Sequence, residues 1–260
     1  MNRIALLSLT ALLAACQTHE TPKQNVPART ASSTDSVASE RAKIHTELGV
    51  NYYQSGQLGV ALEELNTAVA SDRTYAPAYG ALALVYMELK DDERAEANFR
   101  QALKMNSNSS ETKNNYGLFL CQHGREKEGV RQLLDALKNP LYPTPDVAYK
   151  NAGVCARKAG DIKDAENYFQ RALLLNPRQA QALYGLAEAN YARDDYVVAK
   201  QYLVRYVSLM ENPGPEALWL GARIEHRLGD RTALANYGLQ LRRRYPSSPE
   251  TKAYLDGRFE

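Results

Sequence analysis

The sequence has few of the large aromatic residues around which a single globular core is usually built. One Trp and four Phe occur in 260 residues. Thin helical layers need little side-chain bulk each, so this composition favours a stack of such layers over one large core. Neither charge dominates, with 32 basic against 30 acidic side chains. The balance indicates no polyanionic partner, and nucleic-acid binding is not expected.

Residue clusters that support catalysis are also missing. The four histidines are scattered, and no phosphate-cradling glycine loop, zinc-ligand spacing or nucleophile elbow occurs. Cys121 and His123 are two residues apart on an expected helix, so their side chains point to nearly opposite sides. The acidic residues 91–93 and 194–195 fall at expected turns, where capping acids are common. We therefore expect no enzyme activity, no metal and no cofactor.

The apolar run at the N-terminus, from Ile4 to Leu13, is too short to span a bilayer, which takes about 20 residues. It is preceded by a basic residue and ends in Leu-Ala-Ala-Cys, which predicts a secretory signal peptide over residues 1–15. This ending resembles the bacterial lipobox, and the resemblance implies diacylation of Cys16. Gln17 resembles the residue that sorts such lipoproteins to the outer membrane. The alternative is an ordinary signal peptide with an incidental Cys.

Residues 16–40 are predicted to form a lipidated, flexible tether. They are rich in Thr, Ser, Pro, Gln and Ala and show no apolar periodicity. Such a segment buries too little apolar surface to offset the entropy lost on ordering. A flexible chain of about 24 residues has a reach of about 25–30 Å.

One pattern recurs six times in the rest of the chain, in steps of 34, 34, 36, 34 and 34 residues. Each copy has a small residue at the same place: Gly49, Ala83, Gly117, Gly153, Ala187 and Gly221. Another small residue comes twelve positions later, at Ala61, Ala95, Gly129, Ala165, Ala199 and Ala233. A bulky residue follows four positions after that, at Leu65, Phe99, Leu133, Phe169, Leu203 and Tyr237.

This pattern resembles the tetratricopeptide repeat, in which small residues lie where two antiparallel helices cross closely. It predicts an all-α fold, a right-handed superhelical solenoid of six helix-turn-helix repeats over residues 41–247. Residues 248–260 are expected to form a C-terminal cap or tail. One join departs from the period, because residues 139–145 add two residues and three prolines. We interpret this join as a stiff, longer turn, and the alternative is a ligand-binding loop.

Several stretches resemble one family beyond the generic repeat. They are Asn114-Asn115-Tyr116-Gly117-x-Phe119-Leu120, Leu141-Tyr142-Pro143, Ala165-x-x-Tyr168-Phe169, Ala199-x-x-Tyr202 and Tyr237-Gly238-Leu239-Gln240-Leu241-x-x-x-Tyr245-Pro246. Together with the lipobox, the tether and the repeats, they resemble the type IV pilus biogenesis lipoproteins of the PilF/PilW kind, over about residues 41–246.

The resemblance implies a pilotin, an outer-membrane lipoprotein whose solenoid lies in the periplasm. Its partner would be the type IV pilus secretin subunit, whose outer-membrane localisation and multimerisation it would promote, and a monomer is expected. The inference from family to function is an analogy. The alternative is a periplasmic scaffold, anchored to the outer membrane by the same lipid, that recruits cell-wall enzymes.

The partner site is expected on the concave face, which the first helix of each repeat lines in this repeat family. Two positions on those helices are apolar over repeats 1 to 3 and charged or tyrosine-rich over repeats 4 to 6. The candidate residues for binding an apolar partner segment are Val50, Tyr53, Leu84, Met87 and Leu118. The alternative is that neighbouring helices cover this stripe as core.

A disulfide is predicted between Cys121 and Cys155, on the first helices of repeats 3 and 4. At 1.5 Å rise per residue, the two cysteines lie within about 3 Å of the same height on adjacent helices. They leave opposite flanks of their helices, as two parallel neighbours need in order to touch, and the periplasm is oxidising. The alternative is two small buried thiols.

Overall fold

The computed structural model describes residues 31–259, which contain thirteen helices and no strand. The helices are α1 (Ala31–Gln54), α2 (Leu58–Ser71), α3 (Ala76–Glu88), α4 (Asp92–Met105), α5 (Ser110–Gln122), α6 (Glu126–Ala136), α7 (Pro145–Lys158), α8 (Ile162–Leu175), α9 (Ala180–Ala192), α10 (Tyr196–Leu209), α11 (Pro215–Leu228), α12 (Arg231–Arg244) and α13 (Pro249–Leu255). None of these helices is long and apolar enough to cross a membrane. The all-α solenoid predicted from the repeats is confirmed.

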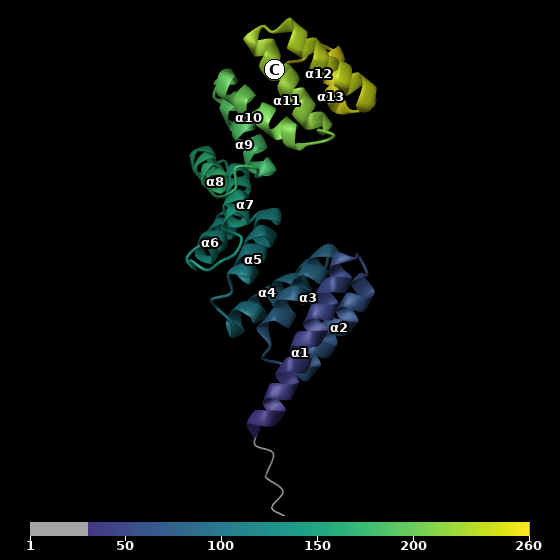
Figure 1. Cartoon of the computed structure of the whole chain (residues 1–260), viewed down its shortest axis with the longest axis vertical. Coiled ribbons are helices and arrows are strands. Elements are labelled where there is room, and N and C mark those ends of the chain that lie inside the picture. The colour runs from purple at the N-terminus through teal and green to yellow at the C-terminus, as the bar shows by residue number, and fades with distance from the viewer. Residues whose placement is uncertain (1–30, 260) are drawn as a thin grey trace, which may run out of the picture. The chain divides into compact units, whose positions relative to one another are not determined.

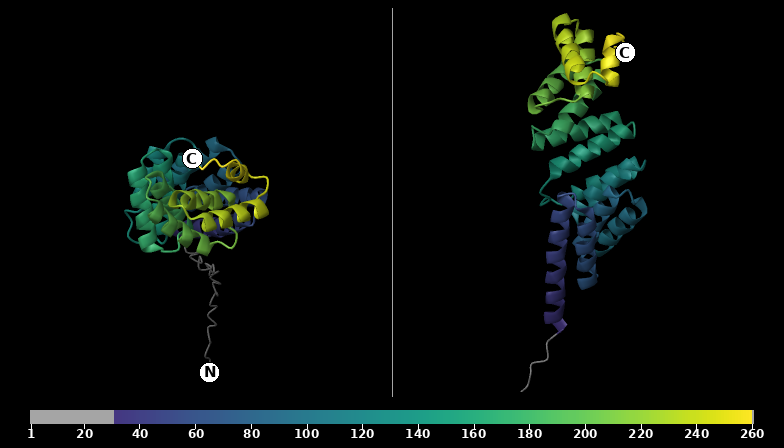
Figure 2. Two further views of the ribbon diagram at one scale, coloured as in Figure 1. Left: turned by 90° about the horizontal axis from the view of Figure 1, so that it is seen from above. Right: turned by 90° about the vertical axis from the view of Figure 1, so that its right-hand side faces the viewer.

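Consecutive helices pair as α1–α2, α3–α4, α5–α6, α7–α8, α9–α10 and α11–α12, one pair for each repeat, and the pairs are stacked (Figures 1 and 2). The first helices of neighbouring repeats also touch one another, since α3 packs on α5, α5 on α7, α7 on α9 and α9 on α11. We call the face that these helices share with α1 the first-helix surface. All contacts described below lie in the unit that begins at Ala38.

Each turn within a repeat stops its first helix with a left-handed residue. Four of these residues are glycines, and the other two are Lys90 and Asp194, with φ of 61° and 62°. The acids next to them cap the second helices: the Asp91 carboxylate accepts from the backbone N–H of Arg94, and that of Asp195 from Val198. The interpretation of these acids as helix caps is therefore confirmed.

The small residues of the repeat lie where the paired helices cross. A Cβ atom on Gly117 would come within 2.8 Å of the Gly129 carbonyl oxygen, so α5 and α6 touch backbone to backbone. Phe169 of α8 fills the space that two other glycines leave, since a Cβ on Gly153 or Gly185 would lie 2.5 Å from its ring. This arrangement confirms the role that the repeat pattern assigns to its small and bulky positions.

Charged groups also join neighbouring repeats. The carboxylate of Glu96 on α4 accepts hydrogen bonds from the Tyr116 hydroxyl at 2.8 Å and from Arg125 at 2.6 Å, both in the next repeat. Partial burial alone would raise the pKa of Glu96, but these hydrogen bonds outweigh it and hold the pKa below its usual value. Glu96 therefore connects repeats 2 and 3 as an ionised group.

The structure corrects the sequence prediction at the N-terminal end of the solenoid and adds detail at its C-terminal end. Helix α1 begins at Ala31, so residues 31–40, which we assigned to the tether, are helical. They contain neither Pro nor Gly, and adding residues to a packed helix needs no new nucleation. Residues 1–30, including Cys16, lie outside the described part of the chain. At the other end, α13 is a packed cap, in which the Thr251 hydroxyl donates to the Tyr245 carbonyl oxygen at 2.7 Å.

Candidate partner-binding surface

A groove of about 280 Å³ opens on the first-helix surface of repeats 1 to 3. Helices α1, α3 and α5 and the turn before α5 line it with Thr46, Val50, Tyr53, Gln54, Ala76, Pro77, Gly80, Ala81, Leu84, Asn106, Ser109, Glu111, Thr112 and Asn115. Three of the five predicted partner-binding residues, Val50, Tyr53 and Leu84, are among them. The structure therefore brings together side chains that are 34 residues apart in the sequence.

The groove combines an apolar wall with a polar margin. Val50 and Leu84 are only half-buried, although both pack against core clusters of their repeats. Burial, and then the nearby charge of Glu88, raise the pKa of Tyr53, so its hydroxyl stays neutral and can donate a hydrogen bond. Gln54 and Asn115 add amide groups that can bind a peptide main chain.

Met87 and Leu118 do not line this groove. Met87 packs against the core cluster around Phe99 and Phe119, and Leu118 is half-buried on α5. Three residues of the predicted apolar stripe therefore line the groove, and two do not.

A second, more polar pocket of about 500 Å³ adjoins the groove and shares Ser109, Glu111 and Asn115 with it. Its other lining residues are Asn108, Ser110, Asn114, Asn139, Tyr142, Pro143 and Thr144. The three-proline join, interpreted from the sequence as a stiff turn, thus borders a pocket through its buried Tyr142. Sequence reasoning missed this pocket, although the added residues and the Asn114-Asn115 pair were visible.

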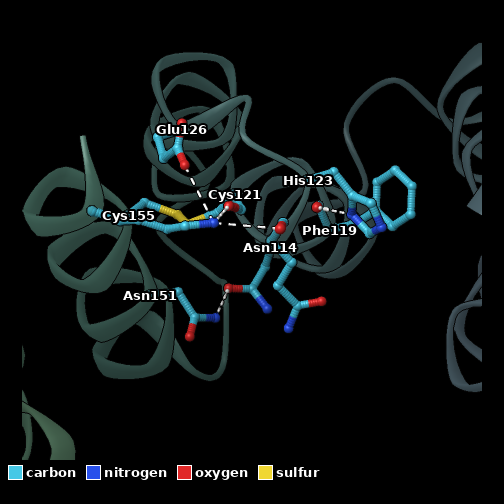
Figure 3. Close-up of a disulfide and its surroundings, with 9 residues drawn as sticks. Asn114, Phe119, Cys121, His123, Glu126, Asn151 and Cys155 are labelled. Carbon is cyan, nitrogen blue, oxygen red and sulfur yellow. Dashed lines mark hydrogen bonds and ion pairs between the residues drawn. A yellow bond between two sulfur atoms is a disulfide. The ribbon is translucent and has the colours of Figure 1, made fainter.

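Asn114 and Asn115 of this pocket are connected to an asparagine of the next repeat. The Asn151 side-chain amide of α7 donates to Asn114 Oδ1 at 3.0 Å, and Figure 3 shows the two side chains pointing toward each other. Asn114 in turn donates to Asn115 Oδ1 at 3.1 Å. Because the Asn115 carbonyl is used internally, its amide N–H groups remain to bind another molecule at the edge of the groove.

Cys121 and Cys155 lie together beneath this surface. Their Cα atoms are 5.5 Å apart and the sulfur atoms are joined as a disulfide (Figure 3). Lys158, one turn after Cys155, donates to the Cys121 carbonyl oxygen at 2.7 Å and pairs with Glu126 at 3.3 Å. The His123 ring makes its polar contacts with other groups, the Phe119 carbonyl oxygen and the Asp92 carboxylate.

The first-helix surface changes character over repeats 4 to 6. Arg157 of α7 forms an ion pair with Glu188 of α9. Burial raises the pKa of Glu188, although Arg157, Tyr184 and Arg223 act in the opposite direction. This part of the surface carries partly buried charges among tyrosines, as the sequence indicated.

The repeats place the chain in a known class of proteins. The sequence profile of the tetratricopeptide repeat matches residues 76–109 and 152–209. With the paired helices and the first-helix surface described above, the protein is a tetratricopeptide-repeat solenoid, a fold that presents extended binding surfaces.

The similarity to individual proteins is more specific. The chain is 33% identical to the type IV pilus assembly protein PilF of Pseudomonas aeruginosa over 223 residues, which span 85% of this chain and 87% of that relative. The chain therefore belongs to the family of type IV pilus biogenesis proteins that includes PilF.

Two solved structures agree with this assignment. The crystal structure of PilW, a widely conserved type IV pilus biogenesis factor, matches with a TM-score of 0.76 and 33% identity, covering 82% of this chain and 98% of PilW. A structure of Pseudomonas aeruginosa PilF matches with a TM-score of 0.80 and 31% identity, covering 85% of this chain and 99% of PilF.

Proposed function

We propose that this protein is a pilotin: an outer-membrane lipoprotein that binds the type IV pilus secretin subunit and promotes its localisation and multimerisation. The groove between α1, α3 and α5 is the observation that carries the proposal. It is an open apolar site on a repeat protein whose relatives serve type IV pilus biogenesis.

The size and lining of the groove suit a short segment of a partner protein. Pockets that enclose whole small ligands are usually about 300–1,000 Å³, so this groove, at about 280 Å³, lies just below that range. A few apolar side chains of the secretin would enter between Val50 and Leu84, while Tyr53 and Asn115 bind its main chain. Burial of a few well-placed side chains commonly accounts for most of the binding energy of an interface.

The groove is tested by placing a charge in it. Leu84→Lys should weaken secretin capture by at least about tenfold, because a buried ammonium opposite an apolar segment is costly. Leu174→Lys is the matched control, since Leu174 is 83% exposed on α8, away from the groove. Capture is measured with purified proteins, and folding by circular dichroism. Unfolding of the Leu84 variant alone would identify this position as core.

A second variant fills the groove without adding charge. A Cβ on Gly80 meets only the Thr112 hydroxyl, at 3.4 Å, which is ordinary contact. The Cβ atom of Gly80→Leu therefore fits, and the variant should fold, because replacing Gly in a helix removes a cost of roughly 0.5–1 kcal/mol relative to Ala; circular dichroism checks this. The variant should nevertheless block capture. If this stable variant still captures secretin, the site lies elsewhere.

We further propose that Cys16 carries the lipid anchor. One acyl chain gives only marginal membrane binding, so stable anchoring requires several. Cys16→Ala should release a folded protein into the soluble periplasm and lower the amount of outer-membrane secretin multimers, whereas Thr18→Ala should change neither. Membrane fractionation and secretin immunoblotting measure the two effects. A Cys16→Ala protein that stays in the membrane fraction would contradict the anchor.

The alternative, a scaffold that recruits cell-wall enzymes, predicts a different deletion strain. Loss of heat-stable secretin multimers and of surface pili supports the pilotin. Intact pili with altered cell shape or lysis would favour the scaffold.

A further inference from the structure

Helix α11 carries a stripe of one aromatic and two cationic side chains. Trp219, Arg223 and Arg227 are four residues apart, so they lie on one face of the helix. Two aromatic residues of repeat 5 face the stripe: the Arg223 guanidinium lies 4.6 Å from the ring centre of Tyr191, and that of Arg227 lies 5.8 Å from the ring of Tyr196. The stripe is separate from the groove of repeats 1 to 3.

Arg223 lies near two aromatic rings, and one of its nitrogen atoms has no hydrogen-bond partner. Besides Tyr191, Trp219 approaches its guanidinium, with 5.9 Å between the guanidinium carbon and the ring centre. Its Nε is buried and has no hydrogen-bond acceptor. Within residues 31–259 neither Arg223 nor Arg227 forms an ion pair, in contrast to Arg125, Arg157 and Arg193.

The acids around the stripe are already engaged. Glu188 is paired with Arg157, and Glu225 with Lys200 at 2.9 Å. Asp194 accepts a hydrogen bond from the Tyr196 hydroxyl. Glu188 also lies close enough to Arg223 for the two charges to attract each other, but within residues 31–259 neither Arg223 nor Arg227 forms an ion pair, so their positive charge is open to an anion from outside.

The Trp219 end of the stripe also packs against Phe259, near the C-terminus. The ring of Phe259 lies 5.3 Å from that of Trp219 and stacks on His226 with 4.3 Å between ring centres. Trp219 therefore has little freedom to move. Arg223 and its aromatic neighbours are thus preorganised for a ligand.

We propose that this stripe is a second interaction surface, which binds a carboxylate side chain in an acidic segment of a partner protein. The rings of Tyr191 and Trp219 lie beside the Arg223 guanidinium, and a planar carboxylate that reaches its two terminal nitrogen atoms can bind two N–H groups at once. Arg227, one turn away, binds the next acidic residue of the segment. Trp219 packs against the aliphatic part of the acidic side chain.

The protein provides its own reporter for this test, because Trp219 is its single tryptophan. The full chain is titrated with acetyl-tetraglutamate amide and, in parallel, with acetyl-tetraglutamine amide, while tryptophan fluorescence is recorded. The glutamate peptide should give a saturable change that weakens as ionic strength rises, because the ion pair is partly exposed. The glutamine peptide should give none.

Variants assign the effect to the arginine. Arg223→Gln should weaken glutamate binding about tenfold or more, and Arg223→Lys should weaken it by a smaller factor, because the charge remains and the planar fork is lost. Arg171→Gln is the matched control: Arg171 also lies near a ring, 5.8 Å from that of Tyr149, but on α8. It should bind as the native protein does.

Three results would overturn the proposal: equal responses to both peptides, native affinity in a folded Arg223→Gln variant, or no binding of the glutamate peptide by calorimetry. Circular dichroism establishes that each variant is folded. None of these results depends on secretin capture by the groove, so this surface and the proposed function stand or fall separately.

Discussion

At the scale of single residues, the helices of this solenoid pack most closely where glycines leave room for a neighbouring side chain. Phe169 is fully buried because Gly153 and Gly185, from the first helices of repeats 4 and 5, leave room for its ring. The sequence pattern predicts the small residue at Gly153 and the bulky residue at Phe169. It does not assign Gly185, which lies one position before the repeated Leu-Ala pair of that helix.

Gly153→Ala should therefore destabilise the protein by about 1–3 kcal/mol, because the new methyl group overlaps the Phe169 ring and forces a shift in a packed core. Gly59→Ala is the matched control. Gly59 is also helical, but a Cβ there meets nothing within 4 Å. It should be neutral or stabilising by up to about 1 kcal/mol. Urea unfolding followed by circular dichroism measures both, and equal effects at the two sites would refute the packing argument.

Two glutamates should change the pH dependence of stability in opposite directions. The pKa of Glu188 is raised by burial, so the stability it contributes is present below its unfolded pKa and is lost as the pH rises through the folded value. The pKa of Glu96 is lowered by its hydrogen bonds, despite partial burial, so its contribution is present above its unfolded pKa and is lost as the pH falls.

Relative to the native protein, Glu188→Gln should therefore gain stability as the pH is raised from about 4 to about 7, whereas Glu96→Gln should lose stability over the same range. Denaturant unfolding at several pH values gives both slopes. Slopes of the same sign for the two variants would contradict the assignment. The substitutions also remove hydrogen bonds to partner residues, but this cost in unfolding free energy does not vary with pH and therefore does not affect either slope.

At the scale of helices, the repeat pattern predicted two paired helices for each repeat. Its first small residues include Ala83, Gly117 and Ala187, which lie within the first helices α3, α5 and α9. Small residues, turn residues and caps act locally, so a sequence reveals them. The start of α1 was missed, because composition predicts whether a segment can fold alone and not whether a neighbouring helix extends into it.

The binding surface was less predictable than the helices. Of the five residues predicted to bind a partner, Val50, Tyr53 and Leu84 line the groove, whereas Met87 and Leu118 do not. The direction of a side chain at the edge of a helix depends on how far neighbouring repeats are rotated, which periodicity does not give. The asparagine pocket joins residues from different repeats, and so do the contacts of Arg223 and Arg227 with Tyr191 and Tyr196, so neither arrangement appears as a motif.

A disulfide between α5 and α7 would stabilise the solenoid at its irregular join. The loop that it closes spans 34 residues, which corresponds to about 3–4 kcal/mol in the chain-entropy model. The periplasmic protein should lack free thiols at Cys121 and Cys155 by non-reducing mass analysis. A reductant should lower its unfolding free energy, and the double variant Cys121→Ala, Cys155→Ala should not respond to it. Two free thiols in protein made in the periplasm would contradict the bond.

At the scale of the whole solenoid, each repeat touches only its neighbours. Among α2 to α13, helices pack on their partner in the same repeat, on the adjoining helix and on the next first helix, and no contact between these helices skips a repeat. Stability in such a stack is approximately a sum of repeat and nearest-neighbour terms. The groove of repeats 1 to 3 and the stripe on repeats 5 and 6 can therefore be occupied independently.

The same reasoning limits how far the loss of the C-terminal cap can spread. Removal of residues 248–260 takes away α13, which packs on α11 and α12 and whose Tyr254 ring lies directly against Gly238. Hydrogen exchange should accelerate in α11 and α12 and stay unchanged in α3 to α6, because those helices lose no neighbour. Trp219 emission should shift to the red as Phe259 leaves its ring. Phe259→Ala separates the two effects, since it should shift the emission while α12 keeps its protection. Faster exchange throughout the repeats of the truncated chain would show instead that the solenoid unfolds as one cooperative unit, with the cap stabilising all six repeats.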